Sequence, residues 1–173
     1  SSRTLKERAI AATRRRRAGQ GKVGVLASGD AVDAVEAVLA HLAAAAPDVF
    51  GKAAVAPVPP MTEGGPALDP LEEIRLLDAA LDHAVLAEVQ VLFTARPLSD
   101  NWFSHWHASR QAAVSSLAGW RGSVAVPVEA FVAYELILHG LRVLGPAWSP
   151  EQLTHEDTRG CLFDFCAHRE DIE

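Results

Sequence analysis

The chain has little cysteine and no long apolar run. Its 173 residues include two cysteines, Cys161 and Cys166, which are too few for the disulfide framework of a small secreted protein and are compatible with reduced thiols or metal ligands. The alanine-rich stretch is interrupted by Asp33, Glu36 and His41, so it falls far short of the roughly 20 apolar residues of a membrane span. The basic N-terminus lacks the apolar core of a secretory signal. We therefore expect a cytoplasmic protein without a membrane segment.

Two common catalytic motifs are also absent. The sequence contains neither G-x-S-x-G nor G-x-x-x-x-G-K-[ST], the patterns of a nucleophile elbow and of a phosphate loop. Enzymes built on those two motifs are therefore disfavoured.

Charge is unevenly distributed along the chain. The net charge is -6, yet residues 1–22 hold eight lysines and arginines against one acidic residue, Glu7. The rest of the chain is acidic and would be repelled by nucleic acid phosphates, so a polyanion could be held only by the leading arm, through Arg14, Arg15, Arg16 and Arg17. A solvated helix face, or an arm lying on its own acidic domain, explains the same run. Nucleic acid is not an expected partner, and we divide the chain into a basic arm, 1–21, and one domain, 22–173.

The apolar pattern predicts alternating strands and helices. Valine-rich or alternating runs predict strands over 22–27, 52–58, 88–94 and 112–117, the last lying at a sheet edge. Helical spacing predicts helices over 30–45, 70–85 and 126–144, with Asp69, Pro70 and Glu72 as the capping signature of the second. The order β-α-β-α-β-β-α indicates an α/β (α+β) fold, a single mixed sheet with packed helices.

The helix expected over 126–144 carries a polar face in an otherwise apolar segment. Glu135, His139 and Arg142 follow one another at intervals of four and three residues, which places them side by side on a helix. A glutamate and a histidine one turn apart can share a metal ion such as zinc. They can equally form an ordinary surface pair beside Arg142.

Two further groups of residues could carry chemistry. His155, Cys161, Cys166 and His168 are four potential zinc ligands, although their spacing is not that of the common zinc fingers and buried thiols explain the cysteines as well. The segment 101–110, NWFSHWHASR, crowds aromatic residues and histidines into an expected loop. Such a loop lines a ligand site or serves as a hydrophobic plug.

Residues 88–173 resemble the archaemetzincins, compact zincin-type metallopeptidases. The segments EVQVLFTARPL and AAVSSLAGW are similar to the family's strand pair at the active site, and VEAFVAYELILHGL stands in the place of the helix that carries H-E-x-x-H-x-x-G-x-x-H-C. THEDTRGCLF is similar to the continuation of that motif, with His155 at the third zinc histidine, Cys161 at the second cysteine and Phe163 at the Met-turn position. The resemblance implies a zincin-like fold.

The same alignment implies a zinc site with an eroded HExxH motif. With His139 at the second zinc histidine, the first falls on Glu135 and the catalytic glutamate falls on Leu136, which cannot activate water. His155 follows His139 by sixteen positions, where the family spacing is six, so an insertion has to loop out. Cys161 remains for a second metal, but no C-x-x-C pair follows it.

Three functions follow. The leading hypothesis is a degenerate zincin-like domain that is inactive as a peptidase. It binds a peptide or protein along the edge strand of the cleft that corresponds to the family's active site. The expected contacts are Trp102, His105, Trp106 and Ser115. The rival is an active zinc-dependent peptidase or hydrolase with Glu135, His139 and His155 as ligands and a base such as Glu156 or His105. A third is an α/β partner-assembly domain with a basic arm. Zinc is the one cofactor that any of these implies.

Overall fold

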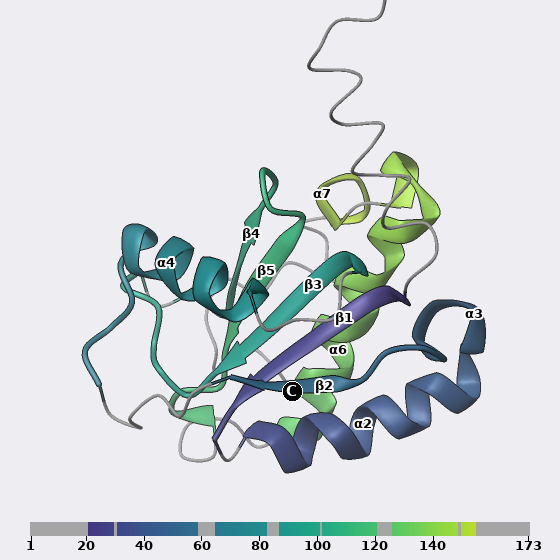
Figure 1. Ribbon diagram of the computed structural model, residues 1–173, viewed down its shortest axis with the longest axis horizontal. Coiled ribbons are helices and arrows are strands. Elements are labelled where there is room, and N and C mark those ends of the chain that lie inside the picture. The colour runs from purple at the N-terminus through teal and green to yellow at the C-terminus, as the bar shows by residue number, and fades with distance from the viewer. Residues whose placement is uncertain are drawn as a thin grey trace, which may run out of the picture.

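The fold is built on one five-stranded mixed sheet, seen in the computed structural model (Figure 1), which describes residues 21–29, 31–58, 65–82, 87–100, 102–120, 126–148 and 150–154. The strands stand in the order β2-β1-β3-β5-β4. Strands β1, β2, β3 and β5 run parallel, and β4 pairs antiparallel with β5 at one edge. Their bounds are β1 Gly21–Ser28, β2 Val55–Val58, β3 Ala87–Thr94, β4 Ser104–His107 and β5 Ala112–Ser116.

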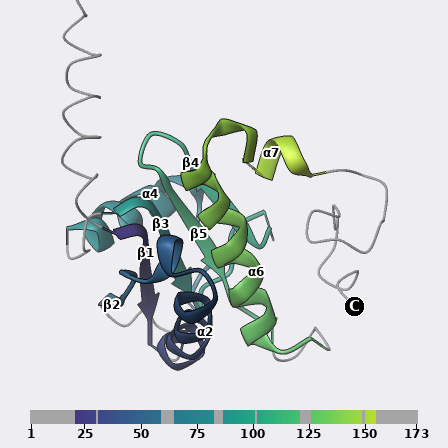
Figure 2. The same ribbon diagram turned by 90° about the vertical axis from the view of Figure 1, so that its right-hand side faces the viewer.

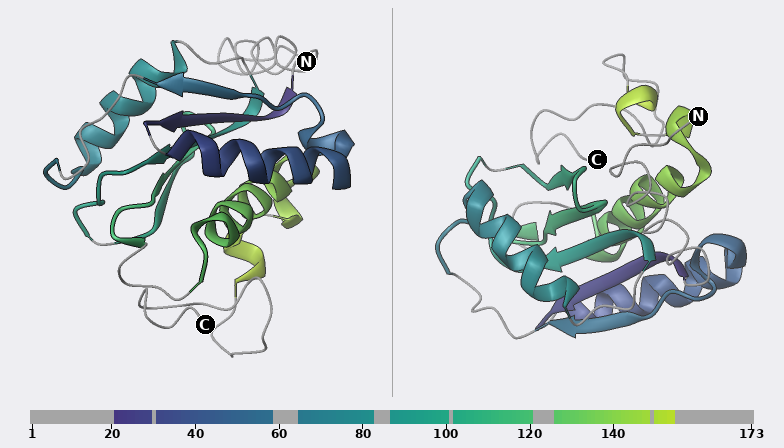
Figure 3. Two further views of the ribbon diagram at one scale, coloured as in Figure 1. Left: turned by 90° about the horizontal axis from the view of Figure 1, so that it is seen from below. Right: turned by 45° about the horizontal axis from the view of Figure 1, so that its top comes forward.

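Helices cover both faces of this sheet. Helix α4 packs on one face, while α2 and α6 lie together on the other (Figures 2 and 3). The helices are α2 Ala31–Ala45, α3 Pro47–Phe50, α4 Pro70–Leu81, α6 Val128–Gly140 and α7 Pro150–Leu153, with 3₁₀ turns η1 Leu141–Leu144 and η2 Pro146–Trp148 after α6.

The central strands are apolar on both sides because both of their faces are covered. Successive side chains of a strand point to opposite faces, and in β1 Val25 joins the core under α2 and α6 while Leu26 joins the core under α4. In β3, Val91 and Leu92 divide in the same way.

Helix α4 begins at the predicted capping box. Asp69 accepts hydrogen bonds from the backbone N–H groups of Leu71 and Glu72 at 2.8 Å, and Glu72 Oε2 accepts from the Asp69 N–H at 3.3 Å. An isolated bridge between Leu68 and Leu98 ties the start of this helix to the segment that follows β3. The capping residues thus fix where α4 starts relative to the sheet.

The predicted fold class, a single mixed sheet with packed helices, is confirmed, but the edge of the sheet was misplaced. Strand β5 lies between β3 and β4, so the run 112–117 is not at the edge. The aromatic segment expected to be a loop contains β4, which is the edge strand. Its sequence, SHWH, has polar residues on both faces and therefore lacks the apolar alternation by which strands are recognised. A tight turn with Gln111 at a φ of 52° leads from it into β5.

The GQGKVG segment and the basic arm can be located relative to the described fold. Residues 19–24 read GQGKVG, the letters of a dinucleotide-binding turn, but Gly21 and Gly24 lie within β1 and not in a turn between strand and helix. Among the described residues, no helix is both long and apolar enough to cross a membrane. The basic arm lies almost wholly outside the described residues, which begin at Gly21.

Candidate functional site

Helix α6 presents Glu135 and His139 to the two last strands of the sheet. Both side chains are buried, with 1% and 3% of their residue surfaces exposed. The hydroxyl of Ser115 on β5 donates to Glu135 Oε2 at 2.6 Å, and His139 Nε2 lies 3.3 Å from the same oxygen. Buried polar groups of this kind need partners to offset their lost hydration. The predicted pairing of Glu135 with His139 is therefore present, but inside the protein.

Strand β4 and the end of α6 complete this group, which we call the α6 cluster: Ser104, Ser115, Glu135, His139 and Arg142. Ser104 Oγ lies 3.0 Å from Ser115 Oγ and 3.3 Å from His139 Nε2. Arg142 donates its Nε–H to His139 Nδ1 at 3.3 Å. On β4, the Trp106 ring stacks on His139 with centroids 5.6 Å apart, and the Arg142 guanidinium carbon lies 3.9 Å from the Trp106 ring centre.

The partners of Glu135 favour the charged form of its carboxyl group. Burial by itself would raise the pKa of Glu135, but the interactions with His139 and the hydrogen bonds from Ser115 and Ser104 outweigh it and hold the pKa below its ordinary value. Hydrogen bonds to the charged form of a carboxyl stabilise that form. The α6 cluster is thus an internal, charged network that joins α6 to β4 and β5.

The hydrogen bond from Arg142 decides which nitrogen of His139 carries its proton. An arginine side chain only donates, so Nδ1 accepts and the ring proton stays on Nε2, the atom that faces Glu135. A histidine that binds a metal through one nitrogen donates the other N–H to an acceptor, whereas here a donor faces that position. A zinc ion bound to Nε2 would require the opposite tautomer.

Only two members of the expected zinc site, Glu135 and His139, lie among the described residues. Glu135 and His139 already bond one another, and His155 and Cys161 lie outside the described residues. Within the part of the chain that the structure describes, no group of three histidine, cysteine, aspartate or glutamate side chains could hold a metal ion. The set of Glu135, His139 and His155 remains a prediction.

The α6 cluster also lacks an activated nucleophile. Ser104 Oγ approaches Nε2 of His139, the nitrogen that carries the proton, so the ring cannot take the proton of Ser104. Leu136, which the resemblance aligns with the general base of a zincin, is fully buried in the core under α2 and α6. None of these described groups is poised for hydrolysis.

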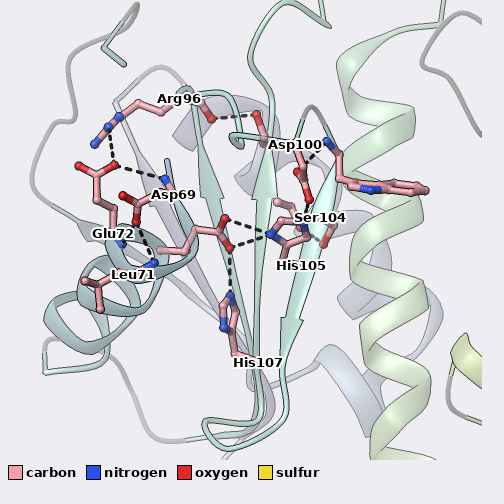
Figure 4. Close-up of polar contacts among 12 residues, drawn as sticks. Asp69, Leu71, Glu72, Arg96, Asp100, Ser104, His105 and His107 are labelled. Atoms are coloured by element: carbon pink, nitrogen blue, oxygen red, sulfur yellow. Dashed lines mark hydrogen bonds and ion pairs between the residues drawn. The ribbon is translucent and has the colours of Figure 1, made fainter. Parts of the chain in front are cut away.

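A second polar cluster lies on the opposite face of β4, under α4. Its members are Glu73, Asp100, His105 and His107 (Figure 4), and we call it the α4 cluster. Glu73 is buried and was missed by sequence reasoning. It stands four and seven residues before the buried Leu77 and Ala80, and this helical spacing is the signal that could have found it.

The residues expected to line one cleft are divided between two faces. Trp106 on β4 belongs to the α6 side with the buried Ser115, while His105 points to the α4 side and contacts Glu73. Trp102, just before β4, is 40% exposed. The basic run of Arg14, Arg15, Arg16 and Arg17 lies outside the described residues.

The sheet order, the antiparallel edge strand and the helices on both faces define a mixed α/β fold. Among solved structures, the chain is similar to the archaemetzincin from Methanopyrus kandleri, with a TM-score of 0.52 and 16% sequence identity over 87% of this chain and 84% of that chain. At this identity the likeness shows the fold. No family model and no curated protein matched the sequence.

Proposed function

We propose that this chain is a zincin-like domain without peptidase activity that binds an extended peptide by adding it as a strand to the edge of β4. The observation that carries the proposal is the position of β4 at the end of the sheet, with no described strand beyond it. An open edge of this kind pairs readily with another extended chain unless it is covered.

The register of the edge hairpin identifies the backbone groups that would bind the peptide. The Ser116 N–H donates to the Phe103 carbonyl, and Ser104 stands opposite Ser115. Bonded and non-bonded pairs alternate along an antiparallel ladder. Ser104 and Trp106 therefore belong to the non-bonded pairs, and their N–H and C=O groups point away from β5. These four groups match the bonding pattern of an added strand.

The α6 cluster supports the absence of peptidase activity. Leu136 cannot serve as a general base, and the tautomer of His139 set by Arg142 opposes zinc binding through Nε2. The base suggested for the rival hydrolase, His105, faces α4 and bonds Glu73 and Asp100. The described residues thus support a binding role for the edge strand over hydrolysis.

Strand addition can be tested with a peptide selected from an immobilised library of random decapeptides. The selected peptide is then made with N-methyl groups on every second amide, in two complementary sets. Because alternate amides of an added strand point toward and away from β4, one set is expected to abolish binding measured by fluorescence anisotropy and the other to leave it nearly unchanged.

The same peptides also test for cleavage. Incubation with the full chain, with and without added zinc, is followed by mass spectrometry, and intact peptide is the expected result. Equal binding of both methylated sets would overturn strand addition, and zinc-dependent cleavage would replace the proposal with the hydrolase.

A further inference from the structure

We infer that Glu73 on α4 is a positioning residue for the edge strand, so that the affinity of β4 for an added peptide depends on this buried carboxylate. The inference rests on the proposed function and names the residue that positions β4 for peptide binding. Three observations carry it: the contacts of Glu73, the position of its partners on the edge strand, and the nature of the other contacts that hold β4.

Both histidines of β4 bond the same carboxylate. His105 Nδ1 lies 3.0 Å and 2.9 Å from the two oxygens of Glu73, and His107 Nε2 lies 3.1 Å from Oε2. The two rings share one face of the strand because they are two positions apart. The Glu73 side chain is fully buried. One carboxylate on α4 therefore bonds both histidines on the face of β4 that lies under this helix.

The polar partners of Glu73 come from the edge strand itself. His105 Nε2 lies 2.8 Å from Asp100 Oδ2, so both ring nitrogens of His105 face carboxylate oxygens. Each ring nitrogen of His105 thus has a carboxylate oxygen within hydrogen-bond distance, one from Glu73 and one from Asp100. A buried carboxylate needs such a partner, and the partner here belongs to the strand that would bind peptide.

The other two acidic side chains of α4 bond elsewhere. Asp78 pairs with Arg110 in the turn between β4 and β5, and Glu72 pairs with Arg96 after β3. These pairs are partly or largely exposed, unlike that of Glu73. Among the described pairs, the contact of Glu73 is therefore the buried tie between α4 and the edge strand.

Strand β4 is otherwise held by β5 and by the α6 cluster. It is four residues long and pairs with β5, and on its inner face Ser104 and Trp106 contact the α6 cluster. Strand addition needs the outward backbone groups of Ser104 and Trp106 at a fixed spacing. Because ordering a binding segment beforehand lowers the entropy that is lost on binding, loss of the Glu73 tie is expected to weaken peptide binding.

The test is Glu73→Gln in the full chain, with the decapeptide selected on the wild type as probe. We expect about tenfold weaker binding of the peptide, which corresponds to about 1.4 kcal/mol. Amide hydrogen exchange at Ser104 and Trp106 is expected to speed up, while exchange in β1 and β3 stays as in the wild type. Asp78→Asn is the matched control, because it removes a carboxylate of the same helix that pairs with the same hairpin at the surface.

The outcomes separate this inference from the proposed function. If the wild type binds no peptide, the proposed function fails, while exchange at β4 still decides whether Glu73 positions the strand. If Glu73→Gln binds peptide and exchanges at β4 as the wild type does, the inference is overturned. His107→Gln removes one tie and leaves the contacts of His105 intact, so it provides the same readouts should Glu73→Gln not fold.

Discussion

Arg142 donates its Nε–H to Nδ1 of His139 over 3.3 Å. His139 lies in the last turn of α6 and Arg142 in the 3₁₀ turn η1 that follows. The bond places a permanent donor on the nitrogen that a zinc-bound histidine would use to donate. This hydrogen bond therefore determines which ring nitrogen of His139 carries the proton.

Zinc content tests the consequence of this bond. Elemental analysis of the purified full chain is expected to show no zinc that depends on His139, because Nε2 carries the proton and faces Glu135. Arg142→Gln offers an acceptor to Nδ1 and is expected to raise zinc affinity. Arg75→Gln, an exposed arginine on α4, is the control. Near one equivalent of zinc in the wild type, lost in His139→Ala, would favour the hydrolase.

Two adjacent serines on β5 provide a matched pair for stability. Ser115 and Ser116 are both buried, but the hydroxyl of Ser115 donates to the ionised Glu135, whereas that of Ser116 donates to the backbone carbonyl of Arg96. Hydrogen bonds to charged groups contribute about 1.5–3 kcal/mol and neutral ones about 1 kcal/mol. Ser115→Ala is expected to lower the free energy of unfolding more than Ser116→Ala in urea titrations. Equal losses would mean that Glu135 is not charged.

The depressed pKa of Glu135 predicts a loss of stability in acid. A carboxyl whose pKa is lower in the folded state contributes stability above its unfolded pKa, near the ordinary 4.5, and this contribution is lost as pH falls through the lower folded value. The unfolding free energy of Glu135→Gln is therefore expected to vary less with pH below about 4.5 than that of the wild type.

An exposed carboxyl serves as the control for that experiment. The pKa of Asp78 is also lowered, by its hydrogen bond to Arg110, but Asp78 is in contact with solvent. Exposed ion pairs contribute little to stability, so Asp78→Asn is expected to keep the acid dependence of the wild type. If Asp78→Asn reduced the pH dependence of the unfolding free energy as much as Glu135→Gln, the effect would come from the loss of any negative charge and not from the α6 cluster.

Close packing between α6 and α3 predicts a further effect. A Cβ atom added at Gly140 would lie 2.8 Å from Cζ of the buried Phe50. Overpacking costs about 1–3 kcal/mol, whereas alanine favours a helix over glycine by about 1 kcal/mol. Gly140→Ala is expected to be destabilised by up to about 2 kcal/mol in urea titrations. Adding Phe50→Leu should restore part of this loss, and no interaction in the double-mutant cycle would contradict the packing argument.

Much of the fold could be predicted because its local signals agree with one another. The capping box at Asp69, the valine-rich central strands and the apolar periodicity of α6 all follow from interactions within a few residues of the chain. The pairing of Glu135 with His139 follows from helical spacing in the same way. Such features do not depend on knowing what lies across the sheet.

The parts that could not be predicted depend on contacts between distant segments. In the strand SHWH, one side bonds Glu73 and the other bonds α6. The sequence therefore lacks the alternation of apolar and polar residues that identifies a strand. The burial of Glu135 was also unexpected, since a glutamate on a polar helix face is ordinarily exposed. Its partner Ser115 comes from another strand, which no spacing within α6 could indicate.

The turn between β4 and β5 also affects how the molecule assembles. This hairpin joins strands that follow one another in the sequence, whereas β1 pairs with β3 only after the chain has passed through α2, β2 and α4. Closing a short loop costs less entropy than closing a long one, and hairpins form within microseconds. The antiparallel hairpin is therefore the local part of the sheet, and without its side-chain ties β4 would open locally while the parallel strands, β5 among them, stay paired.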